Sequence, residues 1–432
     1  MGPMNAAPAI TVDYPIVERR LGNGLRVIAS PDHGAPSVAV NLWYDVGSRD
    51  EEPGRTGFAH LFEHIMFQGS AHVPSGQHIA LLQAAGASVN ATTWFDRTNY
   101  FQTLPTGGLD LALWLEADRL GTLLDALTQE SLDNQREVVK EERRQRYDNV
   151  PYGDAMELLN ALTFPPDHPY GHTTIGSMDD LNAATLADVQ SFFRTHYRPS
   201  NAVLSVVGDV EPDDAFTRVE RYFGRLDGGP KPAKRPAEPL GPLSGTERGE
   251  AFGVVPAEAV YLAWRLPQRG TREYDAVDLA FSVLGQGQTS RLHKTLVRST
   301  ERAEVASATT LGLIGGNSSG IVYARARDGV PIEQLEEDLS REVGRLRSEP
   351  PTERELRRAK AQYARHWLHE LVRVDSRADA FGEYATLHGD PNLVNTRLAE
   401  IDAVTDEDIA TALERWFTPD QRATLIYRRE VR

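Results

Sequence analysis

The 432-residue sequence contains no cysteine. This absence excludes disulfide frameworks, thiol catalysis and every metal or iron–sulfur site that needs a thiolate ligand. A bound metal would therefore have to be held by His, Asp or Glu. The sequence also lacks an uninterrupted apolar run of the ~18 residues that a membrane-spanning helix needs, so we expect no membrane span.

Positive charge is scarce as well. The formal net charge is −16, with 46 Lys and Arg against 62 Asp and Glu. Because nucleic-acid binding needs clustered cations, we expect no nucleic-acid partner. The N-terminal stretch has no basic segment followed by an apolar core, which a secretory signal would show, and this predicts a cytoplasmic location.

The composition and length predict more than one folded domain. Hydrophobic residues make up 40% of the chain and charged residues 25%, as in globular proteins. The length predicts two or three domains. A stretch rich in proline and glycine, 225–249, reads as an extended linker because proline removes backbone donors. We therefore predict a first domain at 15–224 and a second at 250–432.

The two sides of this linker contain a repeat. Segment 181–207 aligns without gaps with 401–427, at a constant offset of 220. Each copy predicts a helix capped by threonine, a break at proline and then a strand. The residues that mark these boundaries are Thr185, Asp188 and Pro199, which recur as Thr405, Asp408 and Pro419. The match indicates that one domain has been duplicated.

Hydrophobic periodicity predicts strands at 25–30, 37–46, 87–94, 99–104, 201–208, 259–266 and 319–326. It predicts helices at 56–68, 76–85, 109–126, 130–147, 153–162, 185–196, 273–285, 332–347, 352–373 and 376–388. Strands and helices do not alternate strictly. The pattern therefore favours an α+β fold: two homologous α/β-sandwich domains, each with a mixed, mainly antiparallel sheet and helices on one face.

The sharpest motif is the H-x-x-E-H pattern of His60, Glu63 and His64. Residues i and i+4 of a helix lie on the same face, so the two imidazoles can bind one Zn²⁺. Glu63 lies on the neighbouring rim and can reach a water on the metal without being a ligand. The flanking residues are apolar, and burying three polar side chains among them is costly unless a metal satisfies them.

A catalytic zinc ion has three protein ligands and an open position, so a third ligand must come from elsewhere. The candidates on the charged helix that follows are Glu137, Glu141 and Glu142. Glu142 lies on the only apolar face of this helix, whose other members are Leu132, Val138 and Val139. An inward-pointing carboxylate is the better ligand. We therefore predict Glu142 as the third ligand and the other two as solvated.

These motifs together resemble the inverted-zinc-motif peptidases of the pitrilysin family, which includes insulin-degrading enzyme and the mitochondrial processing peptidase. The H-x-x-E-H helix is followed by REVVKEERRQRYDN, and the other landmarks are GSRDE (47–51), ASVNATTWFDRTNYF (87–101), PYGHTTIGS (169–177) and YRPSNAVLSVVGD (197–209). The resemblance covers most of 15–432, strongly in the first half and weakly in the second. It implies a zinc metalloendopeptidase of the short, processing-peptidase-like group, in which two chains form a clamshell around a chamber.

The resemblance also implies residue roles. One Zn²⁺ per chain would be held by the two histidines and Glu142, in agreement with the helical-face argument, with Glu63 as the catalytic base. The strand matching 87–94 is a sheet edge in the family and pairs with the substrate backbone. Here that role falls to Asn90, Ala91 and Thr92. Without the resemblance, Asn90 reads as an ordinary strand-end residue.

The second half lacks the metal ligands. A shift of 220 places Ala280, Val283 and Leu284 where the first half has the motif, and Gln362 where it has Glu142. The second half therefore keeps the framework but cannot hold zinc in the same way. We expect it to act as scaffold, wall or substrate-binding half.

Two further positions depart from the family pattern. The family carries an Arg and a Tyr seven residues apart in its second half; here Arg298 takes the Arg position, but Val305 takes that of the Tyr. Many relatives also have a Glu where this chain has Gln135. Because one donor to an oxyanion can be worth ~3 kcal/mol, we expect a sister subunit to supply an Arg/Tyr pair, which makes a heteromer. The alternative is a homodimer that works with Arg298 alone or with another donor.

The sequence therefore predicts a zinc metalloendopeptidase that cleaves unfolded peptides or flexible leader and targeting segments inside a chamber. The alternative is a non-catalytic subunit, structural or peptide-binding, of a larger complex. Relatives of that kind have generally lost the zinc motif, whereas this chain keeps all four positions.

Overall fold

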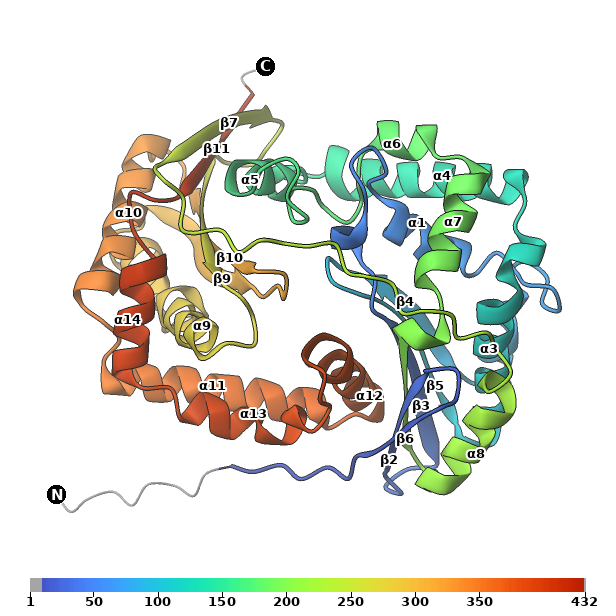
Figure 1. The fold of residues 1–432 in the computed structure, drawn as a ribbon. Helices are drawn as coiled ribbons and strands as arrows, with labels where there is room; N and C mark the ends of the chain where they lie inside the picture. Colours follow the sequence, from blue (N-terminus) through green and yellow to red (C-terminus); the bar gives the residue numbers. More distant parts are fainter. Residues whose placement is uncertain (1–9, 431–432) are drawn as a thin grey trace, which may run out of the picture.

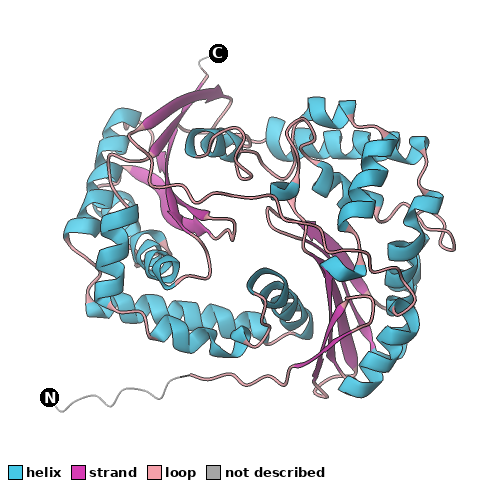
Figure 2. Cartoon of the chain, in the orientation of Figure 1, coloured by secondary structure: helices cyan, strands magenta, loops and turns pink. Residues whose placement is uncertain are grey.

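The protein is described by a computed structural model covering residues 10–430, and each half of the chain contains one mixed β-sheet with helices against it (Figures 1 and 2). The first sheet has the strand order β1-β2-β6-β3-β5-β4 and the second has β7-β11-β8-β10-β9. The strands of the first sheet are β1 Val17–Arg20, β2 Arg26–Pro31, β3 Ser37–Tyr44, β4 Ser88–Thr93, β5 Thr98–Pro105 and β6 Ala202–Gly208. Those of the second are β7 Glu247–Gly253, β8 Ala259–Pro267, β9 Ala303–Leu311, β10 Asn317–Ala326 and β11 Ala423–Arg429.

Each sheet has one parallel pair, β2 with β6 and β7 with β11, and is otherwise antiparallel. The core of each half lies between its sheet and its own helices. The helices of the first half are α1 Phe58–Ile65, α2 Gln77–Ala84, α3 Leu109–Ala126, α4 Gln129–Arg143, α5 Ala155–Thr163, α6 Met178–Ala183, α7 Leu186–His196 and α8 Pro212–Phe223. Those of the second are α9 Arg272–Gly285, α10 Ile332–Ser348, α11 Glu353–Leu371, α12 Val374–Glu383, α13 Leu393–Asp402 and α14 Asp406–Trp416. This two-domain α+β architecture confirms the predicted fold class.

The repeat seen in the sequence is a repeat of local structure. Helices α7 and α14 both begin with a capping box, in which a threonine hydroxyl accepts a hydrogen bond from the backbone of an aspartate three residues later. In each copy a strand follows the helix, β6 in the first half and β11 in the second. Apart from β1, the two sheets also share one strand order. The two halves are therefore built on the same plan.

One feature goes beyond the predicted arrangement, because each sheet also carries a helix on its second face, and that helix comes from the other half. Helix α12 packs on β3 and β6 of the first sheet, where Phe381 and Ala378 belong to one hydrophobic cluster with Trp43 and Val207. Helix α5 packs on the second sheet, where Leu159 joins a cluster with strands β8 and β11. Figure 1 shows this exchange: α5 lies with β7 and β11, and α12 lies beside β3 and β6.

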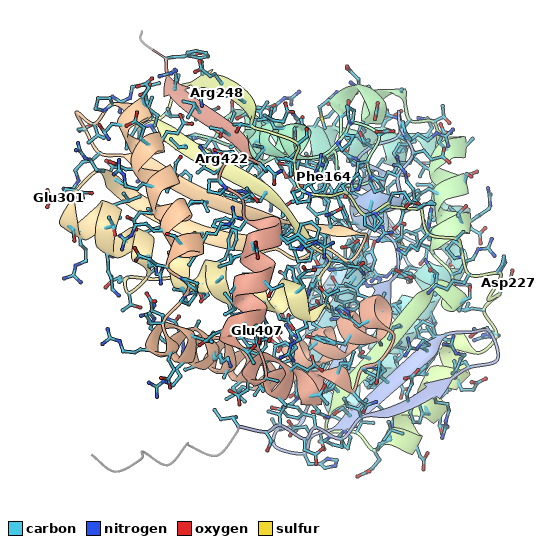
Figure 3. The ribbon with its side chains drawn as sticks, turned by 60° about the vertical axis from the view of Figure 1, so that its left-hand side comes forward. Phe164, Asp227, Arg248, Glu301, Glu407 and Arg422 are labelled. Carbon is cyan, nitrogen blue, oxygen red and sulfur yellow. The ribbon has the colours of Figure 1, made fainter. Side chains whose placement is uncertain are left out.

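The halves also meet through their equivalent hairpin turns. Asp96, in the β4–β5 turn, accepts a hydrogen bond across the junction from the Ile314 backbone N–H at 3.3 Å, and another within the first half from the Tyr170 hydroxyl at 2.6 Å. Figure 3 marks Phe164 where the two halves meet. It belongs to a buried cluster whose other members are Phe95, Tyr170 and Leu313.

The segment between α8 and β7 has no helix or strand, as expected of the region 225–249, except that β7 already begins at Glu247. The segment is tied to the first half. The Lys234 ammonium group donates to the Asp45 carbonyl at 2.7 Å and forms an ion pair with Asp50 at 2.9 Å. Among the described residues, no helix is long and apolar enough to cross a membrane.

Candidate metal centre

Helix α1 carries the motif. Its apolar residues Leu61, Phe62 and Ile65 are buried in the first core, which fixes the side of the helix that His60 and His64 occupy. The two imidazole rings are one helical turn apart, with centroids separated by 4.9 Å and planes nearly perpendicular. Both rings therefore face the same space beside the helix.

Glu142 comes to this space from α4. One carboxylate oxygen, Oε2, lies 3.5 Å from His60 Nε2 and 3.2 Å from His64 Nε2. The three potential ligand atoms all lie within 4.8 Å of one another. The other oxygen, Oε1, pairs with Arg146 at 2.7 Å. Arg146 thus orients the carboxylate and leaves Oε2 facing the histidines, as outer partners of metal ligands commonly do.

This donor set fits a zinc ion. Two ligand atoms about 2.05 Å from a tetrahedral zinc lie about 3.3 Å apart, close to both distances from Glu142 Oε2. Burial, reinforced by the nearby His64, lowers the pKa of His60 to about 4, so its ring is neutral at pH 7. A hydrogen bond from His64 keeps the pKa of Glu142 below its usual value. Neutral imidazole and anionic carboxylate are the forms that bind metal.

The rejected candidates on α4 lie elsewhere. Glu137 pairs with Lys140, and Glu141 pairs with Arg144, both at the exposed surface. One of the three apolar residues predicted to share a buried face with Glu142 is not buried, since Val138 is 42% exposed. Leu132 and Val139 are buried as predicted, and they are enough to set the orientation of the helix.

Glu63 lies on α1 between the two histidines in sequence. Burial raises the pKa of its carboxyl group, while the neighbouring Thr93 hydroxyl and His64 oppose the rise. A carboxylate whose pKa is raised towards neutrality is better suited to accept and return a proton. Its place beside the three potential ligands suits the role predicted for it.

Strand β4 lies at the edge of the first sheet, next to β5, and contacts α1. Asn90 is exposed, Thr92 is partly exposed and Ala91 is buried against the core. The open side of β4 therefore has no neighbouring strand in the described part of the chain, and the Ala91 N–H donates instead to Asn90 Oδ1 at 2.9 Å. The substrate-binding role of these three residues remains a prediction.

Sequence reasoning missed Arg97, in the β4–β5 turn. Its guanidinium donates to the Thr92 carbonyl at 3.0 Å and to Asn99 Oδ1 at 3.2 Å. Its charge also acts on Glu63 and opposes the rise in the pKa of that carboxyl group. A single arginine in a turn reads as a surface residue, so only the fold reveals that it lies close to the site.

The second half has the equivalent helices without the ligands. Ala280, Val283 and Leu284 are fully buried in α9. Arg298 lies near the end of the π-helical segment His293–Ser299, is exposed, and has no ion pair among the residues of the described part of the chain. Val305 lies on the edge strand β9 and is 38% exposed. The role predicted for Arg298 therefore stays a prediction.

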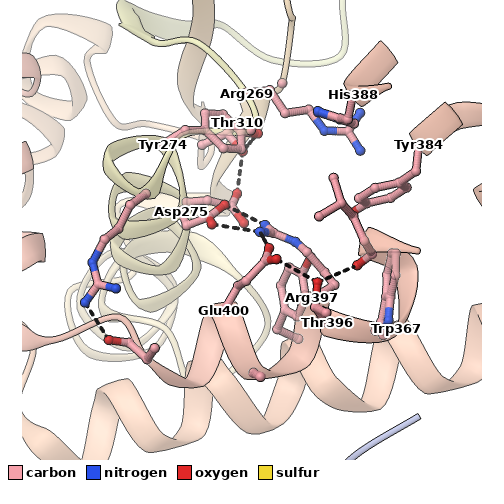
Figure 4. A pocket seen from close by; sticks show the side chains of 18 residues that line it. Arg269, Tyr274, Asp275, Thr310, Trp367, Tyr384, His388, Thr396, Arg397 and Glu400 are labelled. Atoms are coloured by element: carbon pink, nitrogen blue, oxygen red, sulfur yellow. Dashed lines mark hydrogen bonds and ion pairs between the residues drawn. The ribbon is translucent and has the colours of Figure 1, made fainter. Parts of the chain in front are cut away.

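A cavity of about 760 Å³ lies in the second half, and none of the potential metal ligands lines it (Figure 4). Arg397, at its centre, pairs with Asp275 at 2.5 Å and with Glu400 at 3.3 Å. Thr310 donates to Asp278 on another wall. The polar groups of this cavity thus largely satisfy one another, and it holds no group of three metal ligands, so the metal centre is the better candidate site.

Comparison with known proteins agrees with this geometry. The insulinase model of peptidase family M16 matches residues 26–168, and the model of the M16 inactive domain matches residues 183–363. The chain belongs to peptidase family M16. The first match contains all three potential ligands and Glu63, and the second falls largely on the half that lacks them. The predicted resemblance is therefore confirmed.

Relatives named zinc proteases match most of the chain. The zinc protease PqqE of Helicobacter pylori is 29% identical over 416 residues, covering 94% of this chain and 91% of that protein. The uncharacterized zinc protease YmxG of Bacillus subtilis is 25% identical over 408 residues, covering 94% and 96%. The crystal structure of a protease from H. pylori has a TM-score of 0.89 and 27% identity, covering 96% of this chain and all of that one. At the family level, the names of these relatives support zinc and proteolysis.

Proposed function

We propose that this chain is a zinc metalloendopeptidase that hydrolyses peptide bonds in unfolded peptides or flexible leader segments. The observation that carries the proposal is the convergence of His60, His64 and Glu142 within 4.8 Å, with Glu63 beside them. The zinc-protease names of the M16 relatives support the same reaction class.

When bound, zinc supplies Lewis acidity to the scissile carbonyl and lowers the pKa of water. His60, His64 and Glu142 would hold it, with Arg146 fixing the carboxylate. Glu63 accepts a proton from the attacking water on its carboxylate and returns it to the leaving amine. Burial of Glu63 favours this exchange because it raises the pKa of the carboxyl group.

The substrate binds as an added strand along the open edge of β4, beside Asn90, Ala91 and Thr92. Main-chain hydrogen bonds give affinity with little sequence preference. This mode requires an extended peptide, so folded proteins are poor substrates. It is supported by the position of β4 at the sheet edge and by its contact with α1.

The first test is the variant Glu63→Gln, assayed for zinc content and for cleavage of a set of unstructured peptides. We expect zinc to stay bound and the cleavage rate to fall by about 10²- to 10⁴-fold, since the amide cannot take a proton. The matched control is Glu137→Gln, which changes an exposed glutamate paired with Lys140, and it should keep full activity. Normal cleavage by Glu63→Gln would remove Glu63 from the reaction.

We further propose that the chain works as the zinc-bearing subunit of a heteromer, with a sister subunit that supplies an Arg/Tyr pair. The support is Val305, whose side chain cannot donate a hydrogen bond where the family pattern has a Tyr. The purified chain should bind zinc, cleave slowly alone and gain activity when a sister chain is added. Full activity of the chain alone would favour a homodimer. Zinc binding without cleavage in any combination would favour the non-catalytic alternative.

A further inference from the structure

Glu51 is a buried carboxylate that contacts the metal-bearing helix and is not among the three potential ligands. Its side chain is completely buried. One oxygen accepts a hydrogen bond from the Ala59 backbone N–H at 2.8 Å, and the other accepts one from the Gly57 N–H at 2.9 Å. A buried charge is costly unless it is hydrogen-bonded, so these contacts must persist.

Helix α1 depends on this carboxylate for its cap. The residue at its N-cap is Gly57, which has no side chain to accept a hydrogen bond from the first turn. The first four N–H groups of a helix have no partner within it. Glu51 satisfies those of Gly57 and Ala59, and its negative charge lies at the positive end of the helix dipole. Ala59 immediately precedes His60, so the contact fixes the turn that carries the first ligand.

His172 holds the carboxylate from the opposite side. Its Nε2 lies 3.0 Å from Glu51 Oε2 and 3.0 Å from the Ser48 carbonyl oxygen. The loop that follows is packed tightly against the start of α1: a Cβ on Gly176 would lie 2.2 Å from the Gly57 nitrogen. The N-terminus of α1 is therefore clamped between the GSRDE and PYGHTTIGS segments, two landmarks for which the metal centre gives no role.

The same clamp reaches the proposed substrate strand. Glu51 directly follows the 3₁₀ turn Ser48–Asp50. Within that turn, the Ser48 N–H donates to the Trp94 carbonyl at 3.2 Å and the Arg49 N–H donates to the Phe95 carbonyl at 2.9 Å. Trp94 and Phe95 form the turn that ends β4. A displacement of Glu51 would therefore move α1 relative to the edge strand.

We propose that Glu51 and His172 are positioning residues, which fix the metal-bearing helix α1 both in its own geometry and in its distance from strand β4. The proposal rests on the proposed function, because it assigns the clamp to the metal centre. Neither residue touches the reacting atoms. Their effect is exerted through α1 on His60 and His64, and through the 48–50 turn on β4.

The test compares Glu51→Gln with Glu52→Gln in the full chain. Glutamine keeps the shape of Glu51 but turns an N–H group towards one of the backbone donors, so a hydrogen bond is lost. Glu52 is the next residue, is exposed, and has no side-chain hydrogen bond within the described part of the chain, which makes it the matched control. Three quantities are measured: amide exchange in the metal-free protein, zinc affinity by chelator competition, and the visible spectrum of the Co²⁺-substituted protein.

For Glu51→Gln we expect faster amide exchange in 57–64, a zinc dissociation constant about 10-fold higher, and an altered Co²⁺ spectrum. The melting temperature and the exchange of the second half serve as references for global stability. If Glu51→Gln is folded and its α1 exchange, zinc affinity and Co²⁺ spectrum equal those of Glu52→Gln, the proposal is wrong. If Glu51→Gln does not fold, Glu51→Asp takes its place, because its shorter side chain cannot reach both N–H groups. The same three measurements then decide.

His172 provides an independent check by rescue. His172→Leu removes the donor to Glu51 and should lower zinc affinity in the same direction, whereas His172→Gln keeps an N–H donor and should restore part of it. Equal affinity for these two variants would overturn the role of His172.

The outcome does not depend on peptidase activity. If the wild type binds zinc but cleaves no peptide, the proposed function fails while the zinc affinities still test the clamp. If it binds no zinc, the metal centre fails, and unchanged α1 exchange in Glu51→Gln is then the result that rejects the clamp.

Discussion

Helices α1 and α9 occupy equivalent places in the two halves but differ in their side chains and in the way they are capped. Helix α1 carries two histidines and a glutamate beside Glu142 of α4, and its first turn is capped by Glu51 from another segment. Helix α9 is capped locally, by the Thr271 hydroxyl, and most of its residues from Tyr274 onwards are buried. The residues that replace the motif are Ala280, Val283 and Leu284.

This difference teaches that the fold does not need the metal. The second half builds the same strand order, with a core into which α9 contributes apolar residues at the positions of the motif. In the first half, burying the polar side chains of the motif therefore costs free energy that the fold does not require, and function explains why they are there. We therefore expect the zinc ion to be needed for catalysis and not for the stability of the fold.

The largest effect should come from giving the first half the residues of the second, in the triple variant His60→Ala, Glu63→Val and His64→Leu. Zinc binding and peptide cleavage should be abolished. The melting temperature should stay equal or rise, because apolar groups replace buried polar ones. Metal analysis, the cleavage assay and thermal unfolding measure the three quantities.

His72→Ala is the control for this triple variant, since His72 pairs with Asp118 and is not among the potential ligands. It should keep zinc and activity. A triple variant that unfolds at a much lower temperature in its metal-free form would contradict the comparison, because it would show that the motif supports the fold.

The exchanged helices offer a second comparison, in stability. Asp379 of α12 accepts hydrogen bonds from three fully buried donors, Asn41 Nδ2 and Trp43 Nε1 at 3.0 Å and Asn99 Nδ2 at 2.8 Å. Asp379→Ala leaves Asn41 Nδ2 and Trp43 Nε1 without a partner and leaves Asn99 Nδ2 only its hydrogen bond to Asn41 Oδ1, and we expect a loss of about 3 kcal/mol in the free energy of unfolding. Urea denaturation measures this loss.

Asp154, the N-cap residue of α5, provides the matched control, because within the described part of the chain its carboxylate accepts a single hydrogen bond, from the Tyr427 hydroxyl at 2.9 Å. Asp154→Ala should cost about 1 kcal/mol. Equal losses for the two variants would mean that the three donors of the first sheet find other partners.

The smallest effects should come from the repeated helix caps. The Thr185 hydroxyl accepts a hydrogen bond from the Asp188 N–H at 3.2 Å, and Thr405 does the same with Asp408 at 3.2 Å. Each aspartate also pairs with an arginine, at 2.9 Å in the first half and 2.7 Å in the second. Thr185→Ala and Thr405→Ala should each cost about 1 kcal/mol, measured by urea denaturation. A difference well above 1 kcal/mol between them would show that the two caps have diverged.

Much of the fold followed from the sequence, because strong periodicity and caps are local signals. Helix α3 was predicted at its observed bounds, and most other elements within a few residues. The strands that were missed are β1, β7 and β9: β1 is exposed at all four residues, β7 reads ERGEAFG and β9 reads AEVASATTL. Their pairing is decided by neighbouring strands and not by their own composition. The exchange of α5 and α12 was not predicted, because an amphipathic helix does not specify which sheet it covers.

The ligands were predictable for a related reason. Helical spacing alone places His60 and His64 together, and buried Val139 and Leu132 turn Glu142 inward. Residues that act through long-range contacts were not found in this way. Arg97 lies near the site only because the β4–β5 turn folds towards α1, and Glu51 reaches α1 through a turn whose position depends on that hairpin. Such long-range contacts leave no periodic pattern in the sequence from which they could be predicted.

The exchange of α5 and α12 also constrains how the chain acquires its structure during synthesis. Strand β6 completes the first sheet, but the helix that covers its second face is made only after β7 to β10 and α9 to α11 have left the ribosome. Until then Trp43, Val203 and Val207 remain open to solvent on a finished sheet. A nascent first half is therefore expected to be prone to aggregation, and chaperone dependence of the yield should fall once residues up to Glu383 have been translated.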